Sequence, residues 1–143
     1  MTDNGGNFFL PEYKQFPFKE GDLLASRGEN GKYSINKVLR VDKILLKKGS
    51  AISIQSQLFT ATEDDYLLIV SMSYGENEFA TLDQARIAAV SGKWNVHLVH
   101  IPNRSPGAAA DQLLIGHAPV TEAELWGYRF WKEEFDSGNA GIF

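Results

Sequence analysis

Hydrophobic and polar positions alternate along much of the first half of the chain. The apolar positions fall into runs bounded by turn-forming residues, at 22–27, 32–46, 52–58 and 66–72. Asn30-Gly31, between the first two runs, favours a tight β-hairpin because both residues tolerate positive φ. This pattern predicts a meander of three or four antiparallel strands. Val38 interrupts the alternation and predicts a β-bulge or strong bend nearby.

The second half of the chain begins with signals for a helix. Thr81 and Gln84 have the spacing of a capping box, and Gly92 stands where a helix C-terminus favours glycine. Together they predict a short helix over 82–91. Apolar stretches further along predict two short strands, at 94–101 and 113–115.

A second capping box, Thr121 to Glu124, predicts another helix over 122–135. Its apolar stripe consists of Leu125, Tyr128 and Trp131 or Phe135. The helix also carries four crowded rings, those of Trp126, Tyr128, Phe130 and Trp131. One narrow stripe cannot bury all four, so at least one ring should face another layer or solvent. Because aromatic residues are enriched at protein interfaces, Trp126 and Phe130 are candidate binding residues; burial in the core is the alternative.

These elements predict an α+β fold, in which two helices pack on or beside a twisted antiparallel sheet that is partly barrel-like in its N-terminal half. The 143 residues fit one domain. Residues 1–7 are polar and rich in glycine and predict a loose tail, which leaves 8–143 as a single α+β domain. The aromatic and proline residues between Phe8 and Phe18 predict an extended arm that lies over the folded body or, alternatively, docks a partner.

Composition narrows the classes of function. The chain has no cysteine, which excludes disulfides, thiolate metal sites and a cysteine nucleophile. It has no apolar run near the roughly 20 residues that cross a membrane and no signal-peptide pattern, so we expect a soluble, cytoplasmic protein without membrane contact. The net charge of −4 argues against general nucleic-acid binding, which needs a basic excess.

A cationic stretch runs from Lys37 to Lys48, where five basic residues accompany a single acid, Asp42. On a twisted strand, Lys37, Arg40 and Lys43 could form a cationic face. That face would be either an ordinary solvated surface or a docking site for an acidic partner. The three residues are therefore candidate binding residues.

The residues that usually carry catalysis do not form a recognisable set. His97 and His100 lie three apart in a predicted strand and should point to opposite faces, and His117 falls in a predicted loop, so no metal site is expected. The chain lacks a Gly-x-Ser-x-Gly elbow, a Walker loop and a dinucleotide fingerprint. We therefore predict no catalytic residues and no cofactor, and lean towards a protein that is not an enzyme.

Two segments of the chain carry recognisable motifs. The first contains Gly21-Asp22, Gly31-Lys32-Tyr33 and Lys37-Val38-Leu39-Arg40-Val41-Asp42, and the second contains Gly127-Tyr128 and Trp131-Lys132-Glu133. Both segments resemble small bacterial proteins of unassigned function. The opening is also similar to the start of bacterial immunity proteins that neutralise polymorphic toxins. The resemblance implies a protein-binding role but assigns no functional residue.

Three functions follow from these patterns. The leading hypothesis is a non-enzymatic protein-binding module, of which an immunity-type protein is one form. The alternative is a small enzyme or ligand-binding domain whose polar site lies around residues 97–117, with His97, His100, Arg104 and His117 as candidates. The third is a structural subunit of a homo-oligomer.

Overall fold

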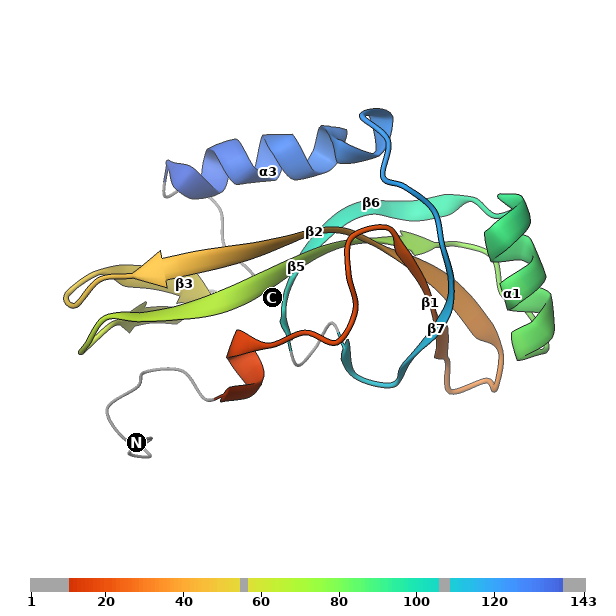
Figure 1. Cartoon of the computed structure of the whole chain (residues 1–143), viewed down its shortest axis with the longest axis horizontal. Coiled ribbons are helices and arrows are strands. Elements are labelled where there is room, and N and C mark those ends of the chain that lie inside the picture. Colours follow the sequence, from red (N-terminus) through yellow and green to blue (C-terminus); the bar gives the residue numbers. More distant parts are fainter. Residues whose placement is uncertain (1–10, 55–56, 106–108, 138–143) are drawn as a thin grey trace.

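The fold is α+β and open-edged (Figure 1). The computed structural model describes residues 11–54, 57–105 and 109–137. Over these ranges a five-stranded antiparallel sheet has the order β6-β5-β2-β1-β7, beside a two-stranded β3-β4 hairpin. The strands are β1 Asp22–Arg27, β2 Tyr33–Leu46, β3 Ala51–Ile54, β4 Gln57–Thr60, β5 Asp65–Gly75, β6 Val96–Arg104 and β7 Gln112–His117. The helical elements are η1 Pro11–Lys14, α1 Leu82–Ser91, η2 Ala123–Leu125 and α3 Trp126–Asp136.

The sheet is built on the long antiparallel pairing of β2 with β5. Its register shifts between Val38 and Arg40, which confirms the bulge predicted from the broken alternation. The β1–β2 hairpin turns through Gly31, whose φ of 79° lies in the left-handed region that glycine adopts without strain. The described strands do not close into a barrel, because β6 and β7 lie at opposite ends of the strand order.

The predicted third strand of the meander, 52–58, is not part of the main sheet. Residues 51–54 and 57–60 instead pair with each other as β3 and β4, and β2 pairs directly with β5. The reason is the composition of the competing runs. β5 buries Leu67, Ile69, Val70 and Met72 completely, whereas the run over 52–58 alternates with serine and glutamine and offers less apolar area to a core.

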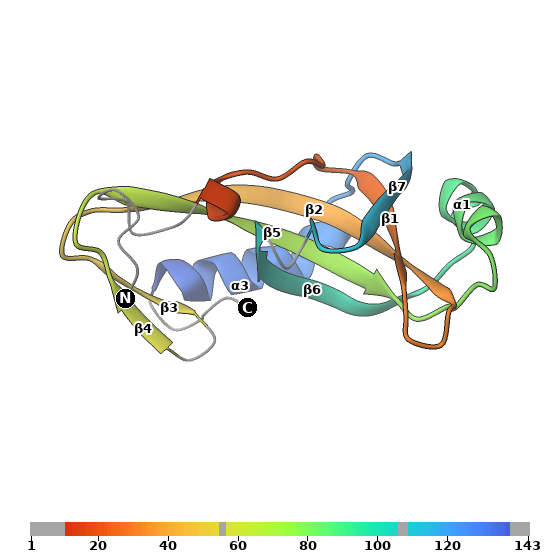
Figure 2. The ribbon, with the colours of Figure 1, turned by 90° about the horizontal axis from the view of Figure 1, so that it is seen from below.

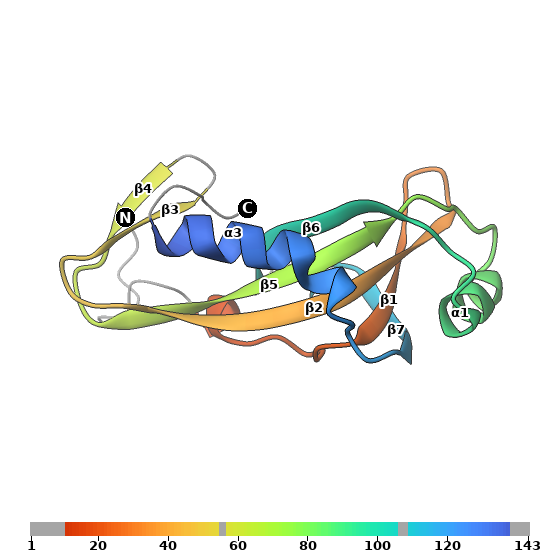
Figure 3. The same ribbon diagram turned by 90° about the horizontal axis from the view of Figure 1, so that it is seen from above.

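Different elements cover the two faces of the sheet. α3 lies over β2, β5 and β6 on one face, as Figures 1 and 3 show. The N-terminal arm crosses the other face (Figure 2), where Phe16 and Phe18 pack against the buried cluster Leu24, Val38, Val70 and Met72. The described part of the arm therefore lies over the core; Phe8, Phe9 and Leu10 lie outside the described residues.

Both predicted helices form, but only α1 begins at its predicted cap; α3 begins at Trp126, four residues later than predicted, without a side-chain cap. Thr81 caps α1, which ends at Gly92 with a φ of 70°. The Thr121–Glu124 box forms as well, with Thr121 N–H donating to Glu124 Oε1 at 2.9 Å, but it opens the 3-10 turn η2 that leads into α3. In the described ranges, no helix has the length and apolar character needed to cross a membrane.

Candidate docking surface

The C-terminal half of α3 packs on an apolar part of the sheet. Trp131 is 8% exposed and belongs to a buried cluster with Leu46, Leu67 and Ile69. Phe135 stacks on Trp131, with ring centroids 5.0 Å apart. Packing of these two rings against the buried cluster of β2 and β5 holds the C-terminal half of α3 on the sheet.

The N-terminal half of α3 covers polar side chains instead. Tyr128 donates its hydroxyl to Asp42 Oδ1 on β2 at 3.0 Å. Burial raises the pKa of Asp42 in spite of this hydrogen bond. Burial, together with the nearby Asp42 carboxylate, also raises the pKa of Tyr128 to about 12. The pair is thus a neutral donor bound to a half-buried acid.

Ser71 and His100 form a second polar pair beneath the helix. His100 Nε2 lies 2.8 Å from Ser71 Oγ, and its ring contacts the rings of Tyr128 and Trp131 at 5.9 and 5.3 Å between centroids. Burial lowers the pKa of His100 to about 4, so the imidazole is neutral at pH 7. Ser71 is completely buried. A substrate cannot reach its hydroxyl in this arrangement, and the pair serves to join β5, β6 and α3.

Lys37 and Glu124 connect the sheet to the turn before α3. Lys37 Nζ lies 2.9 Å from Glu124 Oε1 and donates to the carbonyl of Pro119 at 3.2 Å. Burial alone would raise the pKa of Glu124, but hydrogen bonds from Thr121 and Lys37 hold it below its usual value. Glu124 is therefore an anion whose charge Lys37 balances.

Gly127 allows the first turn of α3 to approach β6 closely. A Cβ atom at this position would lie 3.1 Å from His100 Cβ and 3.3 Å from Val99 Cγ2. On the outer side of the same turn, Trp126 and Phe130 are 73% and 64% exposed and stack with their ring centroids 6.5 Å apart. The prediction that at least one ring faces solvent or another layer is confirmed.

A cavity of about 250 Å³ lies between the start of α3 and β6. Its lining includes Val96, Val99, Trp126 and Gly127, with Ser73 and Glu124 as polar members. Ser73 is 4% exposed, and its hydroxyl is one of two buried side-chain oxygens in the described ranges without a hydrogen-bond partner, the other being Asp42 Oδ2. Val96 and Val99 are themselves 42% and 57% exposed. We refer to Val96, Val99, Trp126 and Phe130 as the α3–β6 surface.

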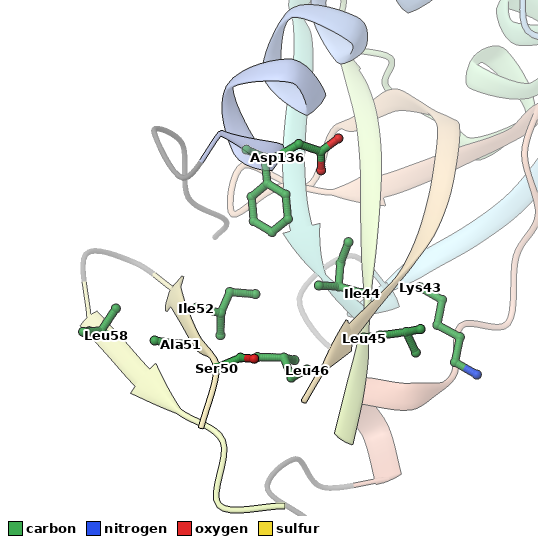
Figure 4. Close-up of a pocket in the computed structure, with 10 residues that line it drawn as sticks. Lys43, Ile44, Leu45, Leu46, Ser50, Ala51, Ile52, Leu58 and Asp136 are labelled. Carbon is green, nitrogen blue, oxygen red and sulfur yellow. The ribbon is translucent and has the colours of Figure 1, made fainter. Parts of the chain in front are cut away.

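A larger hollow of about 620 Å³ lies between the end of β2, the β3-β4 hairpin and the end of α3 (Figure 4). Ile44, Leu46, Ile52 and Leu58 contribute to its largely apolar lining. The charged members, Lys43 and Asp136, lie on different elements, and Asp136 is paired with Lys132. The hollow therefore lacks a convergent set of polar groups among the residues described.

The three predicted cationic residues have different surroundings. Lys37 is 5% exposed at its side chain and is paired with Glu124, so its charge is balanced within the protein. Arg40 is partly exposed and lies 3.1 Å from Glu20. Lys43 is exposed, with its ammonium 4.2 Å from the centroid of the Tyr66 ring. The three side chains therefore do not form the continuous cationic face that the sequence suggested: Arg40 lies beside Tyr128 of α3, whereas Lys43 lies over Tyr66, whose ring also contacts Lys14 of η1.

The residues of the alternative ligand site are not gathered in one place. His97, His100 and Arg104 lie on β6, whereas His117 lies on β7, and three strands separate β6 from β7. His97 is exposed and His100 is half-buried. The pairing of β5 with β6 shifts register between Met72 and Tyr74 and again between Tyr74 and Gly75, so the strict alternation that placed the two histidines on opposite faces does not hold along this stretch. His117 ends β7 instead of lying in the predicted loop, because β7 pairs with β1 as far as Asp22, whose carboxylate lies 3.0 Å from His117 Nδ1.

Metal binding and relatedness give no further assignment. Among residues 11–54, 57–105 and 109–137, no group of three or more histidine, cysteine, aspartate or glutamate side chains could hold a metal ion. Comparison with known protein families, curated proteins and solved structures finds no match to this chain.

Proposed function

We propose that the chain is a non-enzymatic protein-binding module that docks its partner on the α3–β6 surface. The observation that carries this proposal is the gathering of large exposed apolar side chains, Trp126, Phe130 and Val99, around an edge strand. Single exposed apolar residues are normal, but contiguous ones are typical of interaction sites. Tryptophan in particular is enriched among the residues that dominate binding energy.

The position of β6 at the edge of the sheet supports one mode of binding. β6 pairs with β5 on one side and ends the described sheet on the other. Residues 96–99, Val-His-Leu-Val, contain neither proline nor lysine, aspartate or glutamate, residues that often block strand addition, although the pairing of β5 with β6 shifts register twice along residues 96–101. We therefore propose a partner that adds an extended segment along β6 and packs apolar side chains against Trp126 and Phe130.

The resemblance of the opening segment to immunity proteins favours a toxin domain as this partner. An immunity-type protein acts by covering its toxin, which requires a binding surface and no catalytic group. In this proposal the chain protects a cell that produces both proteins.

The test compares two double variants at opposite edges of the sheet. Trp126→Ser with Phe130→Ser removes the rings of the α3–β6 surface. Leu113→Ser with Leu114→Ser is the matched control, since these leucines of β7 are also about half exposed. A protein captured from the host by the wild-type chain is purified and titrated calorimetrically against all three forms.

We expect the Trp126 and Phe130 variant to lose at least about 100-fold in affinity, because each buried aromatic anchor contributes about 2 kcal/mol or more. The control should bind like the wild type. Equal affinity of all three forms would refute docking on this surface. A concentration-dependent dimer of the pure wild-type chain, abolished by the same double variant, would instead assign the surface to self-association. Rescue of cells that express the captured protein would identify the immunity role.

A further inference from the structure

The cavity beside Trp126 is partly open to solvent and has room for a single ring. Its volume of about 250 Å³ exceeds the roughly 150 Å³ of an apolar cavity that binds benzene. It falls below the roughly 300–1,000 Å³ of sites that hold drug-sized ligands or cofactors. Val96, Val99 and the Trp126 side chain provide apolar walls. A ring is the group that would fill this space and exclude water.

Two polar groups give the cavity a chemical preference. The Ser73 hydroxyl is buried without a partner, and a buried hydroxyl of this kind costs free energy until something hydrogen-bonds to it. Glu124 contributes an ionised carboxylate, which can only accept hydrogen bonds. A ring that carries one hydroxyl would exchange a hydrogen bond with the unpartnered Ser73 hydroxyl, beside a carboxylate that favours a donor.

The charge balance of the cavity argues against a cationic ligand. Lys37 Nζ lies 2.9 Å from Glu124 Oε1 and its side chain is 5% exposed, so a full positive charge already compensates the carboxylate. A second cation would have to approach both charges and would gain little. A neutral hydrogen-bond donor is not affected by Lys37 in this way.

We infer that the cavity is a socket for a phenol ring, supplied as a tyrosine side chain by the protein that docks on the α3–β6 surface. As regards the source of the ring, this inference rests on the proposed function. Tyrosine combines the required apolar body with a polar tip, and such residues commonly anchor protein interfaces. The socket lies next to the open edge of β6, where an added strand would place its side chains.

The test uses small rings in place of the partner. The ¹⁵N-labelled full chain is titrated with p-cresol, toluene and benzylamine, and amide shifts of Val96, Val99 and Gly127 report binding. We expect p-cresol to bind about five- to tenfold more tightly than toluene, the effect of one net hydrogen bond, and at least as tightly as benzylamine. Absence of shifts at these amides, equal affinity for toluene, or a clear preference for benzylamine would overturn the inference.

Two serine variants on β5 separate binding from structure. Ser73→Ala should abolish the preference for p-cresol over toluene while leaving the stability of the free protein unchanged or higher, because the hydroxyl has no partner to lose. Ser71→Ala, two residues along the strand, removes a hydroxyl that His100 contacts; it should lower stability and keep the preference. A Ser73→Ala protein that retains the full preference would contradict the proposed socket.

The outcomes also distinguish the socket from the docking surface. If p-cresol fails to bind but the Trp126 and Phe130 variant still loses the partner, the socket is wrong and the proposed function stands. If p-cresol binds as expected but the same variant keeps the partner, the phenol site stands and its occupant is not that protein.

Discussion

The two halves of the interface between α3 and the sheet differ in chemistry although one helix covers both. Under the C-terminal half, Trp131 and Phe135 meet buried aliphatic side chains such as Leu67 and Ile69. Under the N-terminal half, the helix and the turn before it cover Asp42, the Ser71–His100 pair and Lys37. Burial of apolar side chains is favourable throughout, whereas burial of a polar group costs free energy unless the group has a hydrogen-bond partner.

The difference separates stability from position. The apolar half supplies the free energy that holds α3 on the sheet. The polar half adds little net free energy, but its hydrogen bonds are directional and fix where the first turn of α3 lies relative to β6. That turn carries Trp126 and Phe130 and borders the cavity. We therefore expect changes in the apolar half to cost the most stability, and changes in the polar half to cost less and chiefly where a buried polar group loses its partner or gains a charge.

The largest effect is expected from Trp131→Ala. Removal of this buried ring should lower the free energy of unfolding by about 3–5 kcal/mol, through lost apolar burial and the cavity left behind. Urea denaturation followed by circular dichroism measures the change. Phe130→Ala is the matched control: it removes a neighbouring ring of the same helix that is 64% exposed and should change stability by no more than about 0.5 kcal/mol. Similar losses in both variants would show that the two sides of α3 do not differ as described.

A smaller effect should follow from protonation of His100. Its folded pKa of about 4 lies below the usual 6.5, so the unfolded chain takes up a proton at higher pH than the folded protein. The stability that His100 contributes is therefore complete above about pH 6.5 and falls by about 2–3 kcal/mol as the pH drops to about 4. The raised pKa of Asp42 contributes to the pH dependence of stability with the opposite sign. Asp42 is present in each protein compared, so this contribution is common to all of them.

The measurement is the free energy of unfolding of wild type, His100→Gln and His97→Gln at several pH values between 4 and 7. Between pH 7 and pH 4 the free energy of unfolding of His100→Gln should fall by about 2–3 kcal/mol less than that of the wild type, because glutamine cannot be protonated. His97→Gln, an exposed change on the same strand, should follow the wild-type curve. A His100→Gln curve parallel to that of the wild type would show that the imidazole is not held neutral beneath α3.

Local signals in the sequence predicted the elements better than their partners. The capping residues Thr81 and Gly92 and the broken alternation at Val38 depend on neighbours a few positions away, and each prediction is confirmed. The pairing of β2 with β5 depends on which of two distant runs buries more apolar area, which the alternation pattern does not rank. For the same reason the meander was wrong at 52–58.

For a related reason, the sequence predicted only part of the α3–β6 surface and its surroundings. Trp126 and Phe130 could be selected because four rings crowd one helix. Lys37 could not be recognised as buried, since its partner Glu124 lies 87 positions away. Ser73 and Gly127 carry no sequence signal that would join them. Residues 96, 98 and 99 are apolar and fall at both odd and even positions of a strand. This pattern was the one sequence signal for an exposed apolar edge at β6.

The smallest effect should come from Tyr128→Phe, which tests the polar half alone. The variant keeps the ring over the sheet but removes the donor to Asp42, whose second carboxylate oxygen has no partner in the described part of the chain. At pH 7 we expect a loss of about 1–2 kcal/mol, because an ionised carboxylate is left in a half-buried site. Since Asp42 already has a raised pKa, the loss should shrink as the pH falls and the carboxyl becomes neutral.

Tyr66→Phe, at the far end of β5, is the control and should not show this pH dependence. In the double variant with Asp42→Asn the cost of Tyr128→Phe should be smaller, because the charge is absent; a loss that is equal at every pH and in both backgrounds would mean that the Tyr128 hydroxyl does not act through Asp42.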